Sequence, residues 1–285
     1  MKLSKDWKDY QIIDAGDGEK LESWNGTILR RPDPMAIWRK SKPELWDDVD
    51  AYYHRSKKGG GFWEHKNNIK EFWICEYKKL KFKISPTGFK HTGLFPEQAY
   101  NWDLITDLIG KRPHIKVLNL FGYTGGASIA ALKAGASEVV HVDASKGMIT
   151  WAKENVKLNN LDHKTIRYIE DDCLKYMKRE IRRNHHYDLI IMDPPSYGRG
   201  PKNELFKFED QINDLLEAAR TLLSAKPLGV ILNTYTTGYS PMVMYNLMKY
   251  HTKGLTGDIQ SDELCLPIDE RVLPCGLTTS FIYHD

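Results

Sequence analysis

The sequence predicts a Rossmann-like α/β fold, in which a doubly wound, mostly parallel sheet has an antiparallel C-terminal edge and follows a smaller N-terminal β-rich domain. Two observations carry this prediction. From residue 115 onward, short apolar runs alternate with segments of helical period, whereas the first 112 residues contain short strand-like segments rich in basic and aromatic side chains. We therefore expect domains at 1–112 and 113–285, with the boundary at Gly110-Lys111-Arg112-Pro113.

The expected elements of the second domain follow one another in strand–helix pairs. The strands are expected at 116–121, 138–143, 165–170, 187–193 and 228–234, and the helices near 126–135, 145–160, 172–183, 204–224 and 240–251. Strands that alternate with helices form parallel sheets. Two last strands, 257–266 and 277–284, have no helical pattern between them, so we expect them to pair as an antiparallel edge. Ligands of such sheets bind beyond the carboxyl ends of the strands.

The first domain contains a basic and aromatic segment at 55–90. Ten basic residues face three acidic ones there, a net charge of +7, and seven aromatic residues lie among them. Such a mixture suits the neutralisation of RNA phosphates and the stacking of bases. It also suits an ordinary small sheet with lysines on its wet face and rings in its core, and the sequence leaves both interpretations open.

Strand patterns in the first domain are short. Apolar and basic residues alternate over 79–84, which predicts a strand with an outward lysine face. After a turn at 85–88, residues 89–94 are expected to return antiparallel, giving a hairpin at about 76–95. Two further short strands, 27–29 and 35–38, are expected on either side of a proline-rich turn.

The composition excludes several classes of protein. The 285 residues are 41% hydrophobic and 28% charged, ordinary values for a globular chain, and no apolar run approaches the ~18 residues of a membrane span. The charged N-terminus leads into no apolar core, so we expect no secretory signal. The four cysteines, Cys75, Cys173, Cys265 and Cys275, show no metal-binding spacing, which predicts free thiols, no metal and a cytoplasmic location.

The loops after the first two strands indicate a nucleoside-type cofactor. The first runs from Asn119 to Ser128 and contains three glycines, which let the backbone approach a ligand and leave helix N–H groups available. The second strand ends at Asp143, 21 residues after Gly122, where a carboxylate can accept hydrogen bonds from ribose hydroxyls.

The next two loops carry candidate binding and acceptor groups. Asp172 ends a third strand and can accept a hydrogen bond from an adenine amino group, cap a helix, or do both. The fourth strand leads into Asp193-Pro194-Pro195-Ser196-Tyr197, whose two prolines fix a rim of carbonyls. Tyr197 can then offer its ring to a flat substrate.

Together these four loops resemble the class I S-adenosylmethionine-dependent methyltransferases. Within them, the chain resembles the bacterial large-subunit (23S) rRNA methyltransferases of the cytosine-C5 and guanine-N7 type, over about residues 76–284. The resemblance is carried by Asn119-Leu-Phe-Gly-Tyr-Thr-Gly-Gly-Ala-Ser128, Val142-Asp143-Ala144-Ser145, Ala152-Lys-Glu-Asn155 with Leu158-Asn159, Asp171-Asp172-Cys173-Leu-Lys175 and Tyr187 to Tyr197. The hairpin and the segment from Lys90 to Trp102 are similar to that family's hairpin and cofactor-facing segment.

The resemblance implies S-adenosylmethionine as cofactor and a set of residues around it. These are Phe95, Gln98, Phe121, Gly122, Tyr123, Thr124, Gly125, Gly126, Asp143, Ala144, Asp172, Cys173 and Asp193. By the resemblance, the glycine loop borders the methionine part, Asp143 holds the ribose, and Asp172 with Cys173 holds the adenine. The implied catalytic set is Asp193, Pro194, Pro195 and Tyr197, with Asp193 near the sulfonium and the others shaping the acceptor pocket.

Two departures from the family qualify the substrate. Residues 1–75 contain no recognisable RNA-binding domain of the family's usual kind, so the sequence assigns them no role. The cytosine-C5 enzymes need a cysteine just after the fifth strand, where this chain has Asn233-Thr-Tyr-Thr-Thr-Gly238. This disfavours cytosine-C5 chemistry and favours direct transfer to a nitrogen, such as guanine N7 or an exocyclic amine.

We therefore expect a cytoplasmic S-adenosylmethionine-dependent methyltransferase that methylates a base in RNA, with rRNA as the expected substrate, and that binds RNA through 55–90. The alternative is a methyltransferase acting on a small molecule or a protein. A third hypothesis is a nucleic-acid-binding module with an inactive cofactor domain. The sequence predicts neither the acceptor atom nor the oligomeric state.

Overall fold

The computed structural model describes residues 1–56, 60–88, 90–199 and 205–284. Its backbone divides into two compact units. The smaller unit comprises Met1–Tyr100 with Leu264–Cys275, and the larger comprises Asn101–Glu263 with Gly276–Asp285. This division of the backbone differs from the boundary that was expected after residue 112. The expected domain boundary stays a prediction.

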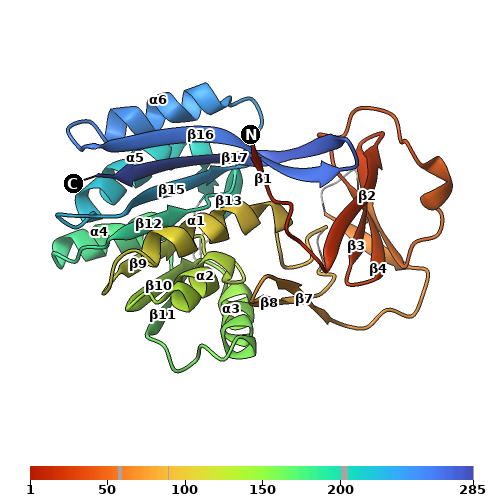
Figure 1. Ribbon diagram of the computed structural model, residues 1–285, viewed down its shortest axis with the longest axis horizontal. Coiled ribbons are helices and arrows are strands. Elements are labelled where there is room, and N and C mark those ends of the chain that lie inside the picture. Colours follow the sequence, from red (N-terminus) through yellow and green to blue (C-terminus); the bar gives the residue numbers. More distant parts are fainter. Residues whose placement is uncertain (57–59, 89, 200–204, 285) are drawn as a thin grey trace. The chain divides into compact units, whose positions relative to one another are not determined.

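The larger unit is built on a mostly parallel sheet, as the sequence predicted (Figure 1). Its strand order is β16-β17-β15-β12-β9-β10-β11. The parallel strands are β9 (Lys116–Leu120), β10 (Glu138–Asp143), β11 (Ile166–Glu170), β12 (Leu189–Met192) and β15 (Gly229–Thr234). The expected antiparallel edge is confirmed, because β17 (Arg271–Tyr283) runs antiparallel to β15 and lies beside β16 (Gly257–Ile268).

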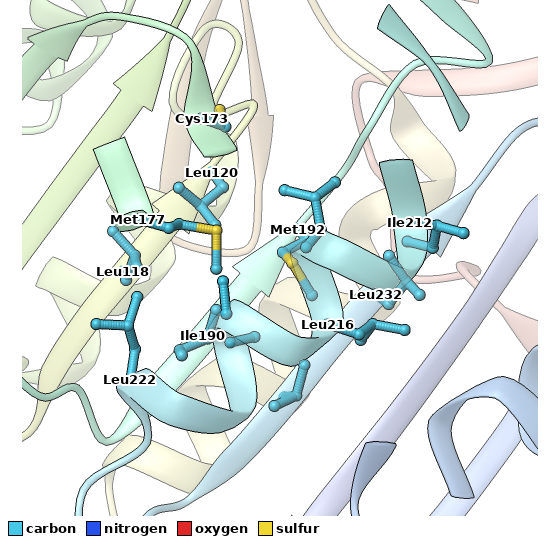
Figure 2. Close-up of a cluster of buried hydrophobic side chains, with 14 of the residues drawn as sticks. Leu118, Leu120, Cys173, Met177, Ile190, Met192, Ile212, Leu216, Leu222 and Leu232 are labelled. Atoms are coloured by element: carbon cyan, nitrogen blue, oxygen red, sulfur yellow. The ribbon is translucent and has the colours of Figure 1, made fainter. Parts of the chain in front are cut away.

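Helices cover both faces of this sheet. They are α1 (Ala99–Ile109), α2 (Gly126–Ala134), α3 (Lys146–Leu158), α4 (Cys173–Arg182), α5 (Phe208–Leu222) and α6 (Pro241–His251). The helices α4, α5 and α6 pack over a core that contains Leu118, Leu120 and Ile190 (Figure 2). Side chains of α1 and α2 contact strand residues directly. The Asn101 amide of α1 donates a hydrogen bond to Asn233 of β15, and the Ser128 hydroxyl of α2 accepts one from Asn119 of β9.

The core under α4 and α5 fixes where the strands end. Figure 2 shows Met177 close to Leu120, and Ile212 and Leu216 on the side of Met192; all five are nearly inaccessible to solvent. Truncation of such a side chain to alanine costs about 2–5 kcal/mol of stability. Because β9 lies between β10 and β12, the chain order reverses at β9, and the carboxyl ends of these three strands form the crevice where ligands of this fold bind.

The smaller unit contains a five-stranded sheet in the order β2-β3-β4-β5-β6. Its strands are β2 (Tyr10–Gly16), β3 (Glu19–Trp24), β4 (Thr27–Pro32), β5 (Ala51–Arg55) and β6 (Gly61–His65), with only the β4–β5 pair parallel. Two 3-10 turns, Pro43–Leu45 and Pro96–Gln98, lie outside it. The short strand β1 (Lys2–Leu3) pairs in parallel with Leu264 and Cys265 of β16.

One strand prediction and one turn prediction in this unit were wrong. The expected strand at 35–38 is an irregular segment, whose carbonyls at Ala36 and Trp38 accept hydrogen bonds from the turn between β2 and β3. Because these carbonyls bond to the turn, they form no hydrogen bonds with a neighbouring strand. The residues expected as the preceding turn, Arg30-Arg31-Pro32, end strand β4 instead.

The hairpin was expected with the wrong partner strand. Strand β8 (Leu80–Ile84) pairs with the preceding β7 (Trp73–Tyr77), not with the following residues. Residue 89 lies outside the described residues, and 90–94 belong to no strand. Trp73, Cys75 and Tyr77 are buried at alternate positions, so β7 matches the buried face of β8 and outcompetes the predicted partner. Lys79 and Lys81 are exposed, as expected of an outward lysine face.

Candidate active site

The loop after β9 has a strained, compact backbone. Phe121 and Tyr123 have φ values of 56° and 51°, in the left-handed region that non-glycine residues seldom adopt. The Gly122 N–H donates to the Val142 carbonyl at 2.9 Å, which ties the loop to β10. Gly125 then begins α2 with φ 93° and no side-chain cap. Strain of this kind persists where the surrounding structure determines the geometry, and it concentrates at ligand sites.

A buried histidine supports this loop from below. A Cβ atom added to Gly122 would lie 2.4 Å from Cε1 of His141, so only glycine fits over the imidazole. The His141 Nδ1 lies 3.0 Å from the Ser128 hydroxyl, which accepts a hydrogen bond from the Asn119 amide at 2.8 Å. Burial lowers the pKa of His141 to about 4, so the ring is neutral at physiological pH. The sequence analysis assigned no role to His141, although a histidine inside an apolar strand was its visible signal.

The carboxylate of Asp143 links the first two loops. Its two oxygens accept hydrogen bonds from the Tyr123 N–H at 2.9 Å and the Ser145 N–H at 2.8 Å. A carboxylate offers about four lone-pair sites, so acceptor capacity remains for two hydroxyls. Burial raises the pKa of Asp143 above its ordinary value. Half-buried at the end of β10 beside Ala144, it fits the ribose role that the resemblance implied, and that role stays a prediction.

Helix α3 fixes the same loop from the other side. The Asn155 amide donates to the Thr124 carbonyl at 2.9 Å, and Asn159 donates to the Asn155 carbonyl at 2.8 Å. A Cβ atom added to Gly125 would lie 3.2 Å from the Ala152 Cβ. Asn155 is one of the residues that carry the resemblance, and in the structure it anchors the loop backbone.

The third loop is arranged around the start of α4. Asp172 caps the helix by accepting from the Lys175 N–H at 2.8 Å, and Asp171 forms an ion pair with Arg179. The Cys173 sulfur accepts the Phe121 N–H at 3.3 Å, which joins the third loop to the first. The capping interpretation of Asp172 is therefore confirmed, and adenine binding by Asp172 and Cys173 stays a prediction.

The acceptor loop follows β12 and continues into a small ribbon. Pro194 is buried, Pro195 is exposed, and Tyr197 is 57% exposed at the start of β13 (Tyr197–Arg199). This strand pairs with β14 (Leu205–Lys207), which the sequence analysis missed because each strand has only three residues. Helix α5 consequently begins at Phe208, whereas the predicted start, residue 204, lies outside the described residues.

Two contacts position this acceptor loop. The Thr236 hydroxyl, from the loop after β15, donates to the Ser196 hydroxyl at 2.9 Å. The Phe206 ring packs edge-on against Phe121 at 5.4 Å, so the ribbon and the glycine loop share one apolar contact. The Asp193 N–H lies 3.4 Å from the Leu120 carbonyl, which keeps the ends of β12 and β9 together.

Cysteine thiols are poorly suited to nucleophilic attack in this chain. All four are free, and three are buried. Burial raises the pKa of Cys75 to about 12, and it raises the pKa values of Cys173 and Cys275 well above their usual range. Near the end of β15, the Asn233 side chain accepts a hydrogen bond from the Asn101 amide at 2.8 Å. Asparagine at this position supplies no nucleophile.

Two predicted cofactor residues belong to the smaller unit. Gln98 is buried in the 3-10 turn Pro96–Gln98, and Phe95 precedes that turn with its ring 5.2 Å from His91. Their approach to the cofactor stays a prediction. Within the described part of the chain, no group of three metal-binding side chains is found, and no helix is long and apolar enough to cross a membrane.

Comparisons with known proteins agree with this geometry. A family model described as S-adenosylmethionine-dependent methyltransferase matches residues 46–233. The chain is 35% identical over 207 residues to the ribosomal RNA large subunit methyltransferase K/L of Shewanella oneidensis, covering 72% of this chain and 27% of that protein. The chain thus spans about 27% of the length of this curated relative.

Solved structures are also similar. The SAM-dependent methyltransferase from Agrobacterium tumefaciens matches with a TM-score of 0.93 at 37% identity, over 98% of this chain and 92% of that one. SMU.776, solved in complex with SAH, matches with a TM-score of 0.78 at 18% identity, over 98% of this chain and 76% of that one. At that identity, the second match speaks for the fold alone.

Proposed function

This chain belongs to the S-adenosylmethionine-dependent methyltransferase family, and from that premise we propose that it methylates a base in RNA, with ribosomal RNA as the expected substrate. One observation carries the proposal. The glycine loop after β9 has Asp143 at the end of one neighbouring strand and the loop from Asp193 to Tyr197 at the end of the other. A nucleoside cofactor held at Asp143 would therefore extend toward the acceptor loop.

Methyl transfer asks mainly for positioning. Bound S-adenosylmethionine supplies a methyl group on a sulfonium, and alignment of an acceptor with it can contribute about 7–11 kcal/mol to lowering the barrier. In this proposal the Pro194 and Pro195 backbone forms a fixed rim, and the Tyr197 ring stacks on the base. A base lifted from RNA costs a few kcal/mol of lost stacking, which such a contact offsets in part.

We propose a ring nitrogen or an exocyclic amine as the acceptor. A nitrogen lone pair attacks directly, whereas cytosine C5 needs a thiolate to activate the ring. Burial raises the pKa values of Cys75, Cys173 and Cys275, and the loop that directly follows β15, residues 235–240, contains no cysteine. The carbonyls and carboxylate of Asp193-Pro194 suit the acceptance of hydrogens from an amine, so no strong general base is required.

The proposed RNA substrate is supported by the relative's name and by charge. The curated relative is a ribosomal RNA large subunit methyltransferase, although the chain covers only 27% of it. In the β7–β8 hairpin, Lys79 and Lys81 are exposed and Lys83 is half-buried beside them, so the hairpin offers cations to phosphates. The four free cysteines suit the reducing cytoplasm in which we expect this reaction.

Nucleoside mass spectrometry of RNA tests the function. RNA from cells without the gene is incubated with the purified protein and S-adenosylmethionine, and a new methylated nucleoside should appear with the wild type. The variant with Asp193→Ala should lose most of this product. Methylation of proteins or small metabolites, without any methylated nucleoside in RNA, would reject the RNA substrate in favour of the alternative.

A charge-reversal experiment tests the RNA contact. Lys79, Lys81 and Lys83 changed together to glutamate should weaken RNA binding many-fold and flatten its salt dependence, because up to three phosphate contacts are lost. The matched control changes the exposed Lys133 and Lys164 of the larger unit in the same way. Equal losses in both variants would show a general charge effect, not a hairpin contact.

A further inference from the structure

Four cations of the smaller unit gather where the chain after the β7–β8 hairpin passes the five-stranded sheet. They are Lys20 of β3, Arg31 of β4, Arg55 of β5 and Lys90, and we call them the Lys90 cluster. The Arg31 guanidinium donates a hydrogen bond to the Lys90 carbonyl at 2.8 Å, which holds this chain segment at the sheet. Burial lowers the pKa of Lys90, and the charges of the other three cations lower it further. The Lys90 ammonium therefore lies among like charges.

Strand register places the three strand members of the cluster on one face of the sheet. Lys20 pairs directly with Arg31 across β3 and β4. Leu29 of β4 pairs with Ala51 of β5, so these two side chains also share a face. Arg31 follows the first of them by two residues and Arg55 follows the second by four, and even spacings along a strand return to the same face. The three cations thus project from the same side of the sheet.

The segment that carries Lys90 packs on that same face. The Tyr53 ring, two residues before the arginine of β5, packs edge-on against Trp63 at 5.3 Å. The Trp63 indole N–H donates to the Thr87 carbonyl at 2.9 Å, and the Thr87 hydroxyl donates to the His91 carbonyl at 2.8 Å. The backbone at Lys90 is therefore held beside the cations of the sheet on both sides.

Two carboxylates reach the cluster, and they balance two of its four charges. The Glu22 carboxylate lies 2.6 Å from the Arg31 guanidinium and 3.6 Å from the Lys20 ammonium. The Asp33 carboxylate lies 3.3 Å from the same ammonium, and it opposes the lowering of the Lys90 pKa. The two remaining members of the cluster form no salt bridge with a described residue. Four positive and two negative groups leave a net charge of +2.

The surroundings of this excess charge favour an anion as its partner. The Lys20 and Arg31 side chains are only 13% and 5% exposed, so water screens their charges poorly. His91 adds no charge, because burial and the nearby cations lower its pKa to about 3. The Thr92 hydroxyl, two residues after Lys90, is buried and has no hydrogen-bond partner among the described residues. Buried hydroxyls are normally hydrogen-bonded, so a ligand with several oxygen atoms suits this place.

We propose that the Lys90 cluster binds a phosphate group, which the Lys90 ammonium and the Arg55 guanidinium contact. Both donors suit phosphate oxygens, the guanidinium through parallel N–H groups and the ammonium as a compact charge. The inference rests on the RNA substrate proposed above, in which this group would be a backbone phosphate; free inorganic phosphate has the same chemistry. Phosphate contacts orient an RNA strand without reading its bases, so the cluster would hold the strand and leave the choice of base to the acceptor loop.

The RNA arm of the test measures binding of a fluorescein-labelled oligouridine to the full chain by fluorescence anisotropy. The double variant Lys90→Gln with Arg55→Gln should bind about 10- to 100-fold more weakly at low salt, because charged hydrogen bonds to one phosphate are lost. Its plot of log affinity against log salt concentration should be flatter by about 0.7, the slope for one phosphate of a single strand. The matched control, Lys5→Gln with Lys8→Gln, removes the same charge from exposed positions of the same unit and should change neither value.

The phosphate arm follows thermal unfolding of the same proteins. Inorganic phosphate, added at constant ionic strength against sodium chloride, should raise the melting temperature of the wild type and of the control, but not that of the double variant. Without phosphate, the double variant should melt no lower than the wild type, because repulsion between cations is relieved. This measurement also shows that the double variant folds.

The outcomes separate this inference from the proposed function. Loss of both oligouridine affinity and phosphate response in the double variant supports a backbone phosphate as the ligand, and loss of the phosphate response alone supports free phosphate. If the double variant matches the wild type in both measurements, the inference is overturned, whereas RNA methylation by the wild type would leave the proposed function intact. If the wild type responds to phosphate but neither binds nor methylates RNA, the proposed function fails and the cluster remains a site for free phosphate.

Discussion

The neutral His141 under the glycine loop predicts a specific pH dependence of stability. Burial lowers its pKa in the fold to about 4, whereas an unfolded chain has a histidine pKa near 6.5. Below about pH 6.5, His141 therefore binds a proton in the unfolded chain but stays neutral in the folded chain. The sign is fixed by this difference: the contribution of His141 to the free energy of unfolding is complete above pH 6.5 and is lost as the pH falls toward 4.

The magnitude follows from the two pKa values. At one pH unit below the unfolded pKa, the loss is about 1.4 kcal/mol, and at two units below it is about 2.6 kcal/mol. The limit is about 3.4 kcal/mol, reached when both states are protonated. A loss of this size is a large fraction of the stability of an ordinary domain, so it is measurable even while other groups titrate.

Denaturant unfolding followed by tryptophan fluorescence measures this effect. The variant His141→Gln should be less stable than the wild type at neutral pH, because the contacts with Ser128 and Gly122 change. The difference in free energy of unfolding between the wild type and this variant should narrow by about 1.4 kcal/mol on acidification to about pH 5.5, since the variant lacks the titrating ring. His163→Gln, at an exposed position, is the control and should show no narrowing. A gap for His141→Gln that stays constant with pH would refute the buried neutral state.

Three further predictions concern cofactor affinity, measured by titration calorimetry. Gly122→Ala should abolish S-adenosylmethionine binding because its methyl group would lie 2.4 Å from the imidazole below, whereas Gly147→Ala should bind normally, since its methyl group would lie 3.7 Å from the Ser145 hydroxyl. Asp143→Asn should weaken binding about 10- to 100-fold through loss of charged hydrogen bonds, and the exposed Asp162→Asn should not. Asn155→Ala should weaken binding about tenfold and speed amide exchange in the glycine loop; unchanged exchange would contradict its anchoring role.

The larger unit was predictable from sequence because its signals are local. The segment 138–143 has valines at three of its six positions, and the strand occupies these residues in the structure. The helix face of α5 and the cap at Asp172 were also visible in the sequence. Such features depend on neighbours a few residues away, which a single sequence displays directly.

The errors have the opposite cause. The partner of β8 was misassigned because Trp73 to Tyr77 contains one charged residue and does not look like an alternating strand, although alternate side chains are buried. The glycine loop is supported by His141, Ser128 and Asn119, which come from two strands and a helix. No sequence spacing therefore predicts this support.

The loop contacts imply that affinity and chemistry can be separated by mutation. The glycine loop is held by Asp143 at one neighbouring strand, by Asn155 from α3 and by Cys173 from α4, all through its backbone. Loss of one anchor leaves the others in place, so it raises the mobility of the free loop and weakens cofactor binding, but it moves no group of the acceptor loop. The acceptor loop has its own anchor, the hydrogen bond between Ser196 and Thr236. Loosening that bond should therefore lower the rate of methyl transfer while cofactor affinity remains, because alignment of the acceptor depends on the acceptor loop.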